Sequence, residues 1–580
     1  MRIFLLLFSI GVALSVKSQI GFSPYAVDSL KSNYRTMGNV RDLNLASSKF
    51  DQSFIRTSGN QFFLDRNYLS SNGSQINFFQ FNNVIQQVSG LPHIGFGYVF
   101  GSQGAQDLSF SYAQVLPKNW VINTNILTSK LDGFFRNTSF SESHYRISLS
   151  KQTDKFGLLF HGGIDKMERE WSGGVIDASL LESFAPLFIP VLKENCNSSL
   201  KSFHSSIGMY FNLWKDNKTL LRFINESSIY GLNRLFSETD TLNGIYANTY
   251  FDTLNSSDQY QHSTLDHFSG LRWQNNKLTY TGGAKAIYWN YRNMGLYRDT
   301  LEFNLEHALK YQFKSFKLQH RGSYNLIGSF NQWNLSQSLS YQSGRFFYFL
   351  KNRISQRAPQ VFQRFYSSNN TRYNNSAVDL ESTFSHDIGI DYVSSSFWAS
   401  FVYELGINRG IYYFDTDLLN WENTSVLSDN SIHQMKLECG YEKGKMNIRQ
   451  EYRFTSANQN WLLIPQHFLG GSFDYRMHLF KQKKMEVTLG MNYTLSSKSN
   501  VIPVIENIGI YDVLNVDINN IQNGIFNIGA YLSIDIETFR FFLKVNNLGY
   551  LWNDLQWNYI EGIYLPEITV RAGITWDFWN

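Results

Sequence analysis

The sequence holds few residues that break or cross-link a chain, with 9 prolines and 2 cysteines among 580 residues. Beyond residue 18 no apolar run approaches the ~20 residues of a membrane-spanning helix, which excludes ordinary transmembrane helices. No linker rich in Pro, Gly or Ser divides the chain, so one large architecture is expected. A formal charge of +4 and dispersed Lys and Arg residues argue against nucleic acid as a partner.

Motifs for catalysis and metal binding are also missing. The sequence has no HExxH, CxxC pair, GxSxG or P-loop, and the nearest string, GYEKGK at 440–445, has the wrong spacing. We therefore expect no enzyme, no cofactor and no metal. His307 and His320 fall on neighbouring predicted strands, where packing is favoured over a metal site. Cys196 in a predicted loop and Cys439 on an apolar face give no disulfide framework.

Aromatic residues, in contrast, make up 16% of the chain, although its mean hydropathy of -0.29 is that of a soluble protein. A membrane β-barrel reconciles the two values. Half of each strand faces lipid and half faces water, and Tyr and Trp gather at the lipid-water interfaces.

Period-two alternation carries the fold prediction. Every residue from Met485 to Leu495 obeys it, and Leu301 to Phe313 departs from it only at His307 and Ala308. The closing segment, Ile568 to Phe578, puts apolar side chains on one face and Thr, Arg, Gly and Asp on the other. Strands this long and this numerous predict an outer-membrane barrel in preference to a soluble β-sandwich.

Connections of two kinds join these strands. Short polar turns are predicted at 117–119, 153–155, 215–218, 275–277, 314–315, 343–345, 394–396, 443–444, 481–484 and 537–538. Long connections are predicted at 168–199, 237–260, 359–375, 415–430, 497–522 and 549–566. With an opening strand at 94–100, this predicts an all-β, single antiparallel transmembrane barrel of about 22 strands (range 18–22). Short periplasmic turns and long extracellular loops are the expected pattern.

The two ends of the chain predict its route to the outer membrane. Residues 1–18 have the Arg, apolar core and small residues of a signal peptide, with cleavage expected between Ser18 and Gln19. Residues 19–91 are expected to form a periplasmic or lumen-filling segment, and 92–580 the barrel. Trp576, Phe578 and Trp579 are the expected signal for the barrel insertion machinery, which, with outer-membrane lipid, is a predicted partner.

The polar faces of the predicted strands supply the pore-lining candidates. These are Glu302, Glu306, Lys310, Lys317, Arg321, Lys436, Glu438, Arg449, Glu451, Arg453, Glu486, Asp535, Arg540, Lys544 and Arg571. With Asp577 added, nine positive charges oppose seven negative ones, so no strong preference for ions of one sign is predicted. Many of these charges could simply pair across strands.

Three segments are candidates for filling so wide a lumen: 19–91, the loop 168–199 and the loop 359–375. The loop 168–199 contains acidic residues and the apolar stretch FAPLFIPVL. Two interpretations stay open for it, a loop that folds inward and narrows the barrel, or a solvated loop with a hydrophobic contact patch.

Several segments carry a resemblance to a known family: residues 92–120, SGGVIDASLLESF, APQVFQRFYSSNNTRYNN, FFLKVNNLGYL and the closing RAGITWDFWN. Together they resemble the putative porin family of Bacteroidota. That resemblance implies an outer-membrane barrel without a defined substrate. The chain departs from many such barrels by ending at Asn580, two places past Phe578. No function is carried over to the loop around Asn370 and Thr371.

The leading hypothesis for function is passive diffusion of small hydrophilic solutes through a water-filled barrel. The alternative is a blocked barrel that acts as a structural anchor or as a subunit of an outer-membrane assembly or transport complex, with a periplasmic or surface protein as partner. An outer-membrane lipase or protease would need a constellation of Ser and His at the rim, and the sequence shows no recognisable one. Energy-coupled transport would need a plug domain, for which 19–91 is short and lacks a glycine-rich organisation.

Overall fold

A computed structural model describes residues 91–579, apart from gaps at 240–245, 247, 329, 376–378, 411, 416–418, 424–429, 459–464, 481–483, 502–503, 512–520, 523, 525, 552–557, 561–562 and 565–566. The predicted signal peptide and the segment 19–90 lie outside the described residues. Within the described ranges, no helix is long and apolar enough to cross a membrane.

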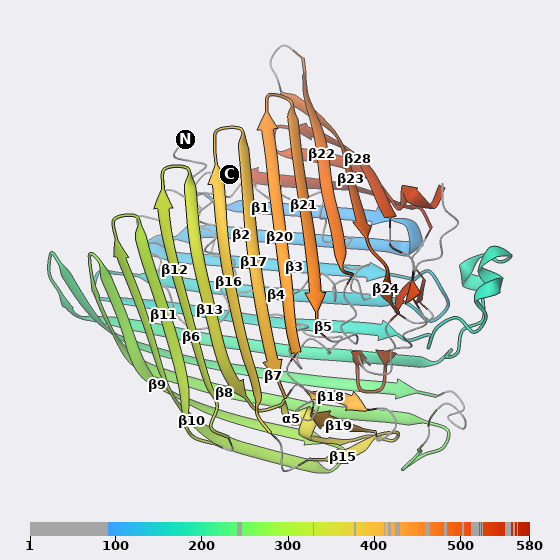
Figure 1. Cartoon of the computed structure of the whole chain (residues 1–580), viewed down its shortest axis with the longest axis horizontal. Coiled ribbons are helices and arrows are strands. Elements are labelled where there is room, and N and C mark those ends of the chain that lie inside the picture. The colour runs from blue at the N-terminus through green and yellow to red at the C-terminus, as the bar shows by residue number, and fades with distance from the viewer. Residues whose placement is uncertain are drawn as a thin grey trace.

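The described residues form one closed antiparallel barrel of 22 strands, as predicted. Its strands are β1 (His93–Gly101), β2 (Ala105–Leu116), β3 (Trp120–Leu131), β4 (Phe140–Gln152), β5 (Phe156–Glu170), β6 (Cys196–Lys215), β7 (Thr219–Glu238), β8 (Ser256–Asn275), β9 (Leu278–Asn293), β10 (Leu296–Phe313), β11 (Phe316–Ile327), β12 (Trp333–Ser343), β13 (Phe346–Arg357), β16 (Glu381–Val393), β17 (Phe397–Arg409), β20 (Asn430–Lys443), β21 (Met446–Ala457), β22 (His467–Leu479), β23 (Met485–Ser496), β28 (Phe526–Ile536), β29 (Phe539–Asn546) and β32 (Thr569–Trp579). In Figure 1 the yellow and orange strands of one wall cross the blue and teal strands of the opposite wall steeply, which is the tilt that closure of a sheet requires.

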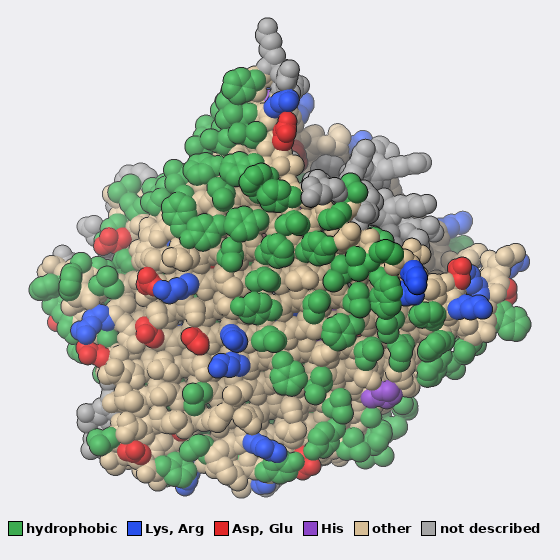
Figure 2. Space-filling view, turned by 180° about the vertical axis from the view of Figure 1, so that it is seen from behind, with side chains coloured by type: hydrophobic (Ala, Val, Ile, Leu, Met, Phe, Trp, Pro, Cys, Tyr) green, Lys and Arg blue, Asp and Glu red, His purple; other side chains and the backbone are tan. Residues whose placement is uncertain are grey.

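Alternation assigns the two faces of the wall. On β10 the side chains of Leu301, Phe303 and Leu305 are exposed on the outer face, whereas Glu302 and Glu306 point the other way. Apolar side chains are spread over the outer surface seen in Figure 2. A strand with lipid on one side and a polar interior on the other produces this pattern.

Nine of the ten predicted short turns lie at one end of the barrel, and the tenth, at 481–484, falls largely outside the described residues. The backbone of several of these tight turns adopts positive φ. In two of the turns a residue with positive φ is a glycine, Gly344 or Gly444, and in three others it is Lys118, Lys314 or Glu537. The opposite rim, called the loop end below, carries the long connections. There the prediction was wrong in detail, because the 168–170 run, assigned to a loop, completes β5, and Cys196 begins β6. Both strands extend further because their paired register continues to Glu170 and Asn197.

The barrel closes between its first and last strands. Nine residue pairs join β1 to β32, from His93 opposite Trp579 to Gly101 opposite Arg571. A Cβ atom at Gly101 would lie 2.2 Å from the Val570 carbonyl oxygen, so only glycine fits there. The first residue of β1 and the last residue of β32 lie side by side at the short-turn rim. An even number of antiparallel strands places both ends of the barrel at the same rim.

Candidate functional site

All fifteen pore-lining candidates lie on the inner face. Cross-strand register places them there, because residues opposite one another on neighbouring strands share a face. Lys310, Lys317 and Arg449 are exposed to the interior, whereas Lys544 and Arg571 are buried where β29 meets β32.

On the wall formed by β20 to β29, several of these charges pair with one another. Lys436 forms ion pairs with Glu438 and Glu451. A guanidinium nitrogen of Arg453 lies 2.6 Å from a carboxylate oxygen of Glu451. Arg540 Nε donates to Asp535 at 2.6 Å. This wall is polar with little net charge.

The loop between β13 and β16 folds into the lumen at the loop end. It contains the one-turn helix α5 (Val361–Arg364) and a hairpin of β14 (Phe365–Ser367) and β15 (Arg372–Asn374). In Figure 1, α5 and β15 lie within the outline of the barrel at this end, beside the hairpin of β18 (Tyr412–Asp415) and β19 (Asn420–Asn423). The predicted filling loop 359–375 is thus an ordered inner layer.

Aromatic packing holds this layer against the wall. Tyr366 stacks on Tyr373 with ring centroids 5.6 Å apart, and Phe362 stacks on Tyr260 of β8 at 6.3 Å. Tyr291 of β9 is 1% exposed within the same cluster. Burial of these rings supplies the main apolar stabilisation of the inner layer.

Two asparagines at the hairpin tip fix the neighbouring loop between β7 and β8. Asn369 accepts hydrogen bonds from the backbone N–H groups of Phe251 and Asp252 and donates to the Asp252 carbonyl oxygen. Asn370 accepts from the Ser256 hydroxyl at 2.8 Å. A carboxamide has an oxygen that accepts hydrogen bonds and an NH2 group that donates them, so it can bind both the N–H and the C=O groups of a loop backbone. Nothing in the sequence pattern around either residue indicates this role.

A third loop, between β23 and β28, joins the same layer through its backbone. Arg234 of β7 donates to the carbonyl oxygens of Asn507 at 2.6 Å and Glu506 at 2.7 Å, and the Tyr366 hydroxyl donates to the Asn507 carbonyl at 3.2 Å. The Asn507 side chain donates to the Thr371 hydroxyl. Loops more than a hundred residues apart are therefore bound to one another.

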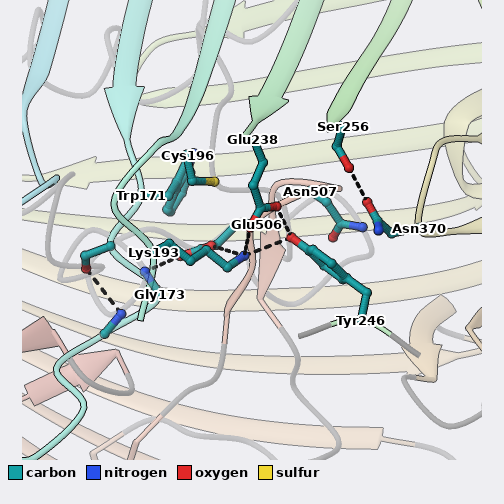
Figure 3. A network of polar contacts seen from close by, with 12 residues as sticks. Trp171, Gly173, Lys193, Cys196, Glu238, Tyr246, Ser256, Asn370, Glu506 and Asn507 are labelled. Carbon is teal, nitrogen blue, oxygen red and sulfur yellow. Dashed lines mark hydrogen bonds and ion pairs between the residues drawn. The ribbon is translucent and has the colours of Figure 1, made fainter. Parts of the chain in front are cut away.

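Lys193 is the ionic centre of this assembly (Figure 3). Its ammonium lies 2.8 Å from a Glu506 carboxylate oxygen and 3.6 Å from Glu238, and it donates to the Tyr246 hydroxyl. Burial acts to lower the pKa of Lys193, but Glu506 and further neighbours act the other way and leave the pKa above its ordinary value of 10.5. Burial, and then Glu238, raise the pKa of Tyr246. One protonated lysine thus connects three loops. Because its pKa is raised, the contribution is complete below about pH 10.5 and is lost only as the pH rises through the pKa of the folded protein.

Substituting Lys193→Met is expected to loosen the loop assembly, because two carboxylates would lose their buried cation at a cost of ~3–5 kcal/mol. We expect chymotrypsin to cut the loop between β23 and β28 at least about tenfold faster than in the parent protein. Lys155→Met, in an exposed short turn, is the control and should leave the cleavage rate unchanged. Equal cleavage of the parent and Lys193→Met would show that the ion pairs do not hold the loop.

The tip of the loop between β5 and β6 does not enter the lumen. Two short 3-10 turns, Ala178–Glu182 and Pro186–Phe188, form the teal coil that projects beyond the rim in Figure 1. Phe188 is 77% exposed there, and Leu187 is 57% exposed. Of the two interpretations left open for this loop, the hydrophobic patch describes its tip, whereas its base joins the inner layer through Lys193 and Gly173.

His307 and His320, which the sequence places on neighbouring strands, lie close together. His307 Nε2 lies 2.9 Å from His320 Nε2 on the outer face. Within the described ranges, no group of three or more His, Cys, Asp or Glu residues could hold a metal ion.

Comparison with known proteins places the fold and the family. Three solved structures with similar barrels are the copper transporter OprC (10% identity, TM-score 0.63, 84% of this chain and 80% of that chain), the FrpB iron transporter from Neisseria meningitidis, F3-3 variant (11%, 0.61, 84% and 82%), and the siderophore receptor PirA from Acinetobacter baumannii (11%, 0.60, 85% and 81%). At these identities the similarity is one of fold alone. No curated protein sequence matches the chain significantly. The profile of the family described as "Putative porin" matches residues 24–580, and the chain therefore belongs to this family of outer-membrane barrels.

Proposed function

We propose that the barrel is a water-filled channel through which small hydrophilic solutes diffuse passively, with the inward-folded loops narrowing its loop end. The observation that carries the proposal is the charged inner wall. Lys310, Lys317 and Arg449 lie on the inner face and remain exposed. Charges on a wall packed solid with protein would be costly unless each were paired, whereas water solvates them.

Liposome swelling tests this proposal. Liposomes containing the purified protein should swell in solutions of uncharged sugars, at rates that fall steeply as the sugar grows, because the loop layer restricts the opening. Swelling no faster than that of protein-free liposomes, with the protein shown to be folded and inserted, would refute passive diffusion.

A second candidate function is a blocked barrel that serves as an anchor or as a subunit of a larger outer-membrane complex. The buried aromatic layer around Tyr260, Tyr291 and Tyr366 favours it, because such packing resembles a domain core. The structural neighbours named as transporters and receptors share the fold, and their named activities would come to this chain only as further proposals. Impermeable liposomes, together with a protein that co-purifies stoichiometrically, would favour this candidate.

The proposal includes the route to the membrane. Export would depend on cleavage between Ser18 and Gln19, and insertion on the machinery that recognises the closing strand, with no catalytic activity of the barrel itself. Mass spectrometry of the purified protein should give a mature chain that begins at Gln19; persistence of Met1 would contradict export by this signal.

A further inference from the structure

The inner wall formed by β7 to β13 differs from the rest of the lumen in its charge. Cross-strand register runs from Arg222 to Arg272, then through Thr281, Ala308, Arg321 and Ser336 to Arg353. Four of the seven positions in this row are arginine. We call this set, with the two lysines described next, the basic wall.

Two lysines extend the basic wall toward the short turns. Lys310 lies one inward row away, between Thr279 and Gln319 in register, and Lys317 lies a further row along on β11. Lys310, Lys317 and Arg353 are exposed to the interior, and Arg272 and Arg321 are half-buried. Solutes in the lumen can therefore reach these side chains.

Neutral hydrogen-bond donors fill the spaces between the cations. The Arg row contains Thr281 and Ser336, and the Lys310 row contains Thr279, Gln319 and Ser338. No Asp or Glu occupies either row from β7 to β13. The acidic residues of these strands lie nearer the loop end, where Glu306 is two residues beyond Ala308 and Lys285 pairs with Asp266 at 2.9 Å.

This arrangement changes what the near balance of charges means. Nine positive and seven negative candidates predicted no preference, yet Lys436, Arg453 and Arg540 of the β20 to β29 wall lie beside carboxylates. In the basic wall, by contrast, two arginines are opposite each other in register. Arg222 and Arg272 are direct cross-strand neighbours, and like charges in that position repel. An anion between them would relieve the repulsion.

We propose that the basic wall binds small solutes that carry phosphate groups as they pass through the channel, a proposal that rests on the channel function above. Adjacent strands are ~4.8 Å apart, so Arg272 and Arg321, three strands apart, lie within ~15 Å of each other with Lys310 between them. Planar guanidinium groups bind phosphate oxygens in pairs, and a lysine adds a point charge. A tetrahedral dianion accepts more hydrogen bonds than a carboxylate does, which suits a wall rich in donors.

Phosphate block of chloride current in planar bilayers tests this site. In the parent protein, inorganic phosphate should reduce the current at concentrations where acetate does not. In the triple variant Arg272→Gln, Lys310→Gln, Arg321→Gln, the half-blocking concentration should rise about tenfold or more, as expected for the loss of charged hydrogen bonds.

A control variant removes the same number of charges elsewhere in the lumen: Lys436→Gln, Arg453→Gln, Arg540→Gln. Its half-blocking concentration should change by less than about twofold if the basic wall, and not the overall lumen charge, binds phosphate. Equal weakening in both triple variants, or no block of the parent protein, would overturn the proposal. Heat-modifiable migration in electrophoresis checks that each variant has folded.

The two proposals can fail separately. If the folded parent protein carries no current, the channel function fails, and equilibrium dialysis of radiolabelled inorganic phosphate against the detergent-solubilised protein then tests the basic wall alone. Binding by the parent and control proteins, but about tenfold weaker binding by the basic-wall variant, would support the site. Equal binding by all three, or none by any, would refute it.

Discussion

Replacing Tyr366 to Tyr373 with two glycines is expected to raise single-channel conductance severalfold. These residues form the tip of the inner hairpin, and Phe365 and Asn374 are already paired in register, so a two-residue turn can join them. The change removes the stacked pair Tyr366 and Tyr373 and the hydrogen bonds of Asn369 and Asn370 that fix the neighbouring loop. A 22-strand barrel is wide once its filling is lost.

The outer loop provides the control for this experiment. Replacing residues 178–188 with two glycines shortens a connection by a similar length. It removes the coil that projects beyond the rim, with two leucines that pack against the cluster of Phe135, but Lys193 stays in place. Conductance should then equal that of the parent protein. If both deletions raised conductance alike, general loosening of the rim, and not removal of a constriction, would explain the increase. An unchanged conductance in the hairpin variant would place the constriction elsewhere.

Removal of Phe578 to Asn580 is expected to abolish stable insertion in the outer membrane while export continues. The closing strand pairs with both β1 and β29, and the deletion removes the last two seam pairs, Phe578 with Ile94 and Trp579 with His93. It also takes away the ring that lies 4.3 Å from Trp576. Heat-modifiable migration of the truncated protein should be lost; a truncated protein that migrates like the parent would show that this end is dispensable.

Two substitutions on the closing strand test whether its outer face lies against lipid. One places an Asp on the outer face, and the other places an Asp on the inner face. Trp576 is 42% exposed on the outer face, so Trp576→Asp puts a charge against lipid, where a charged side chain is destabilising. Thr575→Asp puts the same charge on the inner face opposite Arg540. We expect the first change to reduce the inserted fraction more than the second. Equal losses would mean that the strand does not distinguish its two faces.

The barrel could be predicted from the sequence because its rules are local. Period-two alternation, as in Met485 to Leu495, needs only a strand with lipid on one side, and the nine short turns within the described ranges fall where polar residues interrupt that pattern. Inner-face assignments such as those of Glu302 and Arg571 followed from the same period. Strand ends at the loop rim could not be located as well, because alternation in β5 continues through Glu168 to Glu170 beyond the apolar band.

The loop assembly could not be predicted, because its contacts are not local. Lys193 and Glu506 are 313 residues apart, and nothing near either residue indicates the other. Asn369 and Asn370 look like ordinary turn residues in the sequence and act instead through backbone groups of another loop. The grouping of positive charge on β7 to β13 also could not be predicted, because it depends on the strand register. A count of charges does not say which of them are neighbours.

Single-channel recording of the unmodified mature protein in planar bilayers tests the central claim most directly, that a continuous path of water passes the loop layer. We predict discrete steps of uniform size with a linear current-voltage relation, and smaller steps than those of the hairpin variant. Silent bilayers, in the presence of protein shown by heat-modifiable migration to be folded and inserted, would contradict the account.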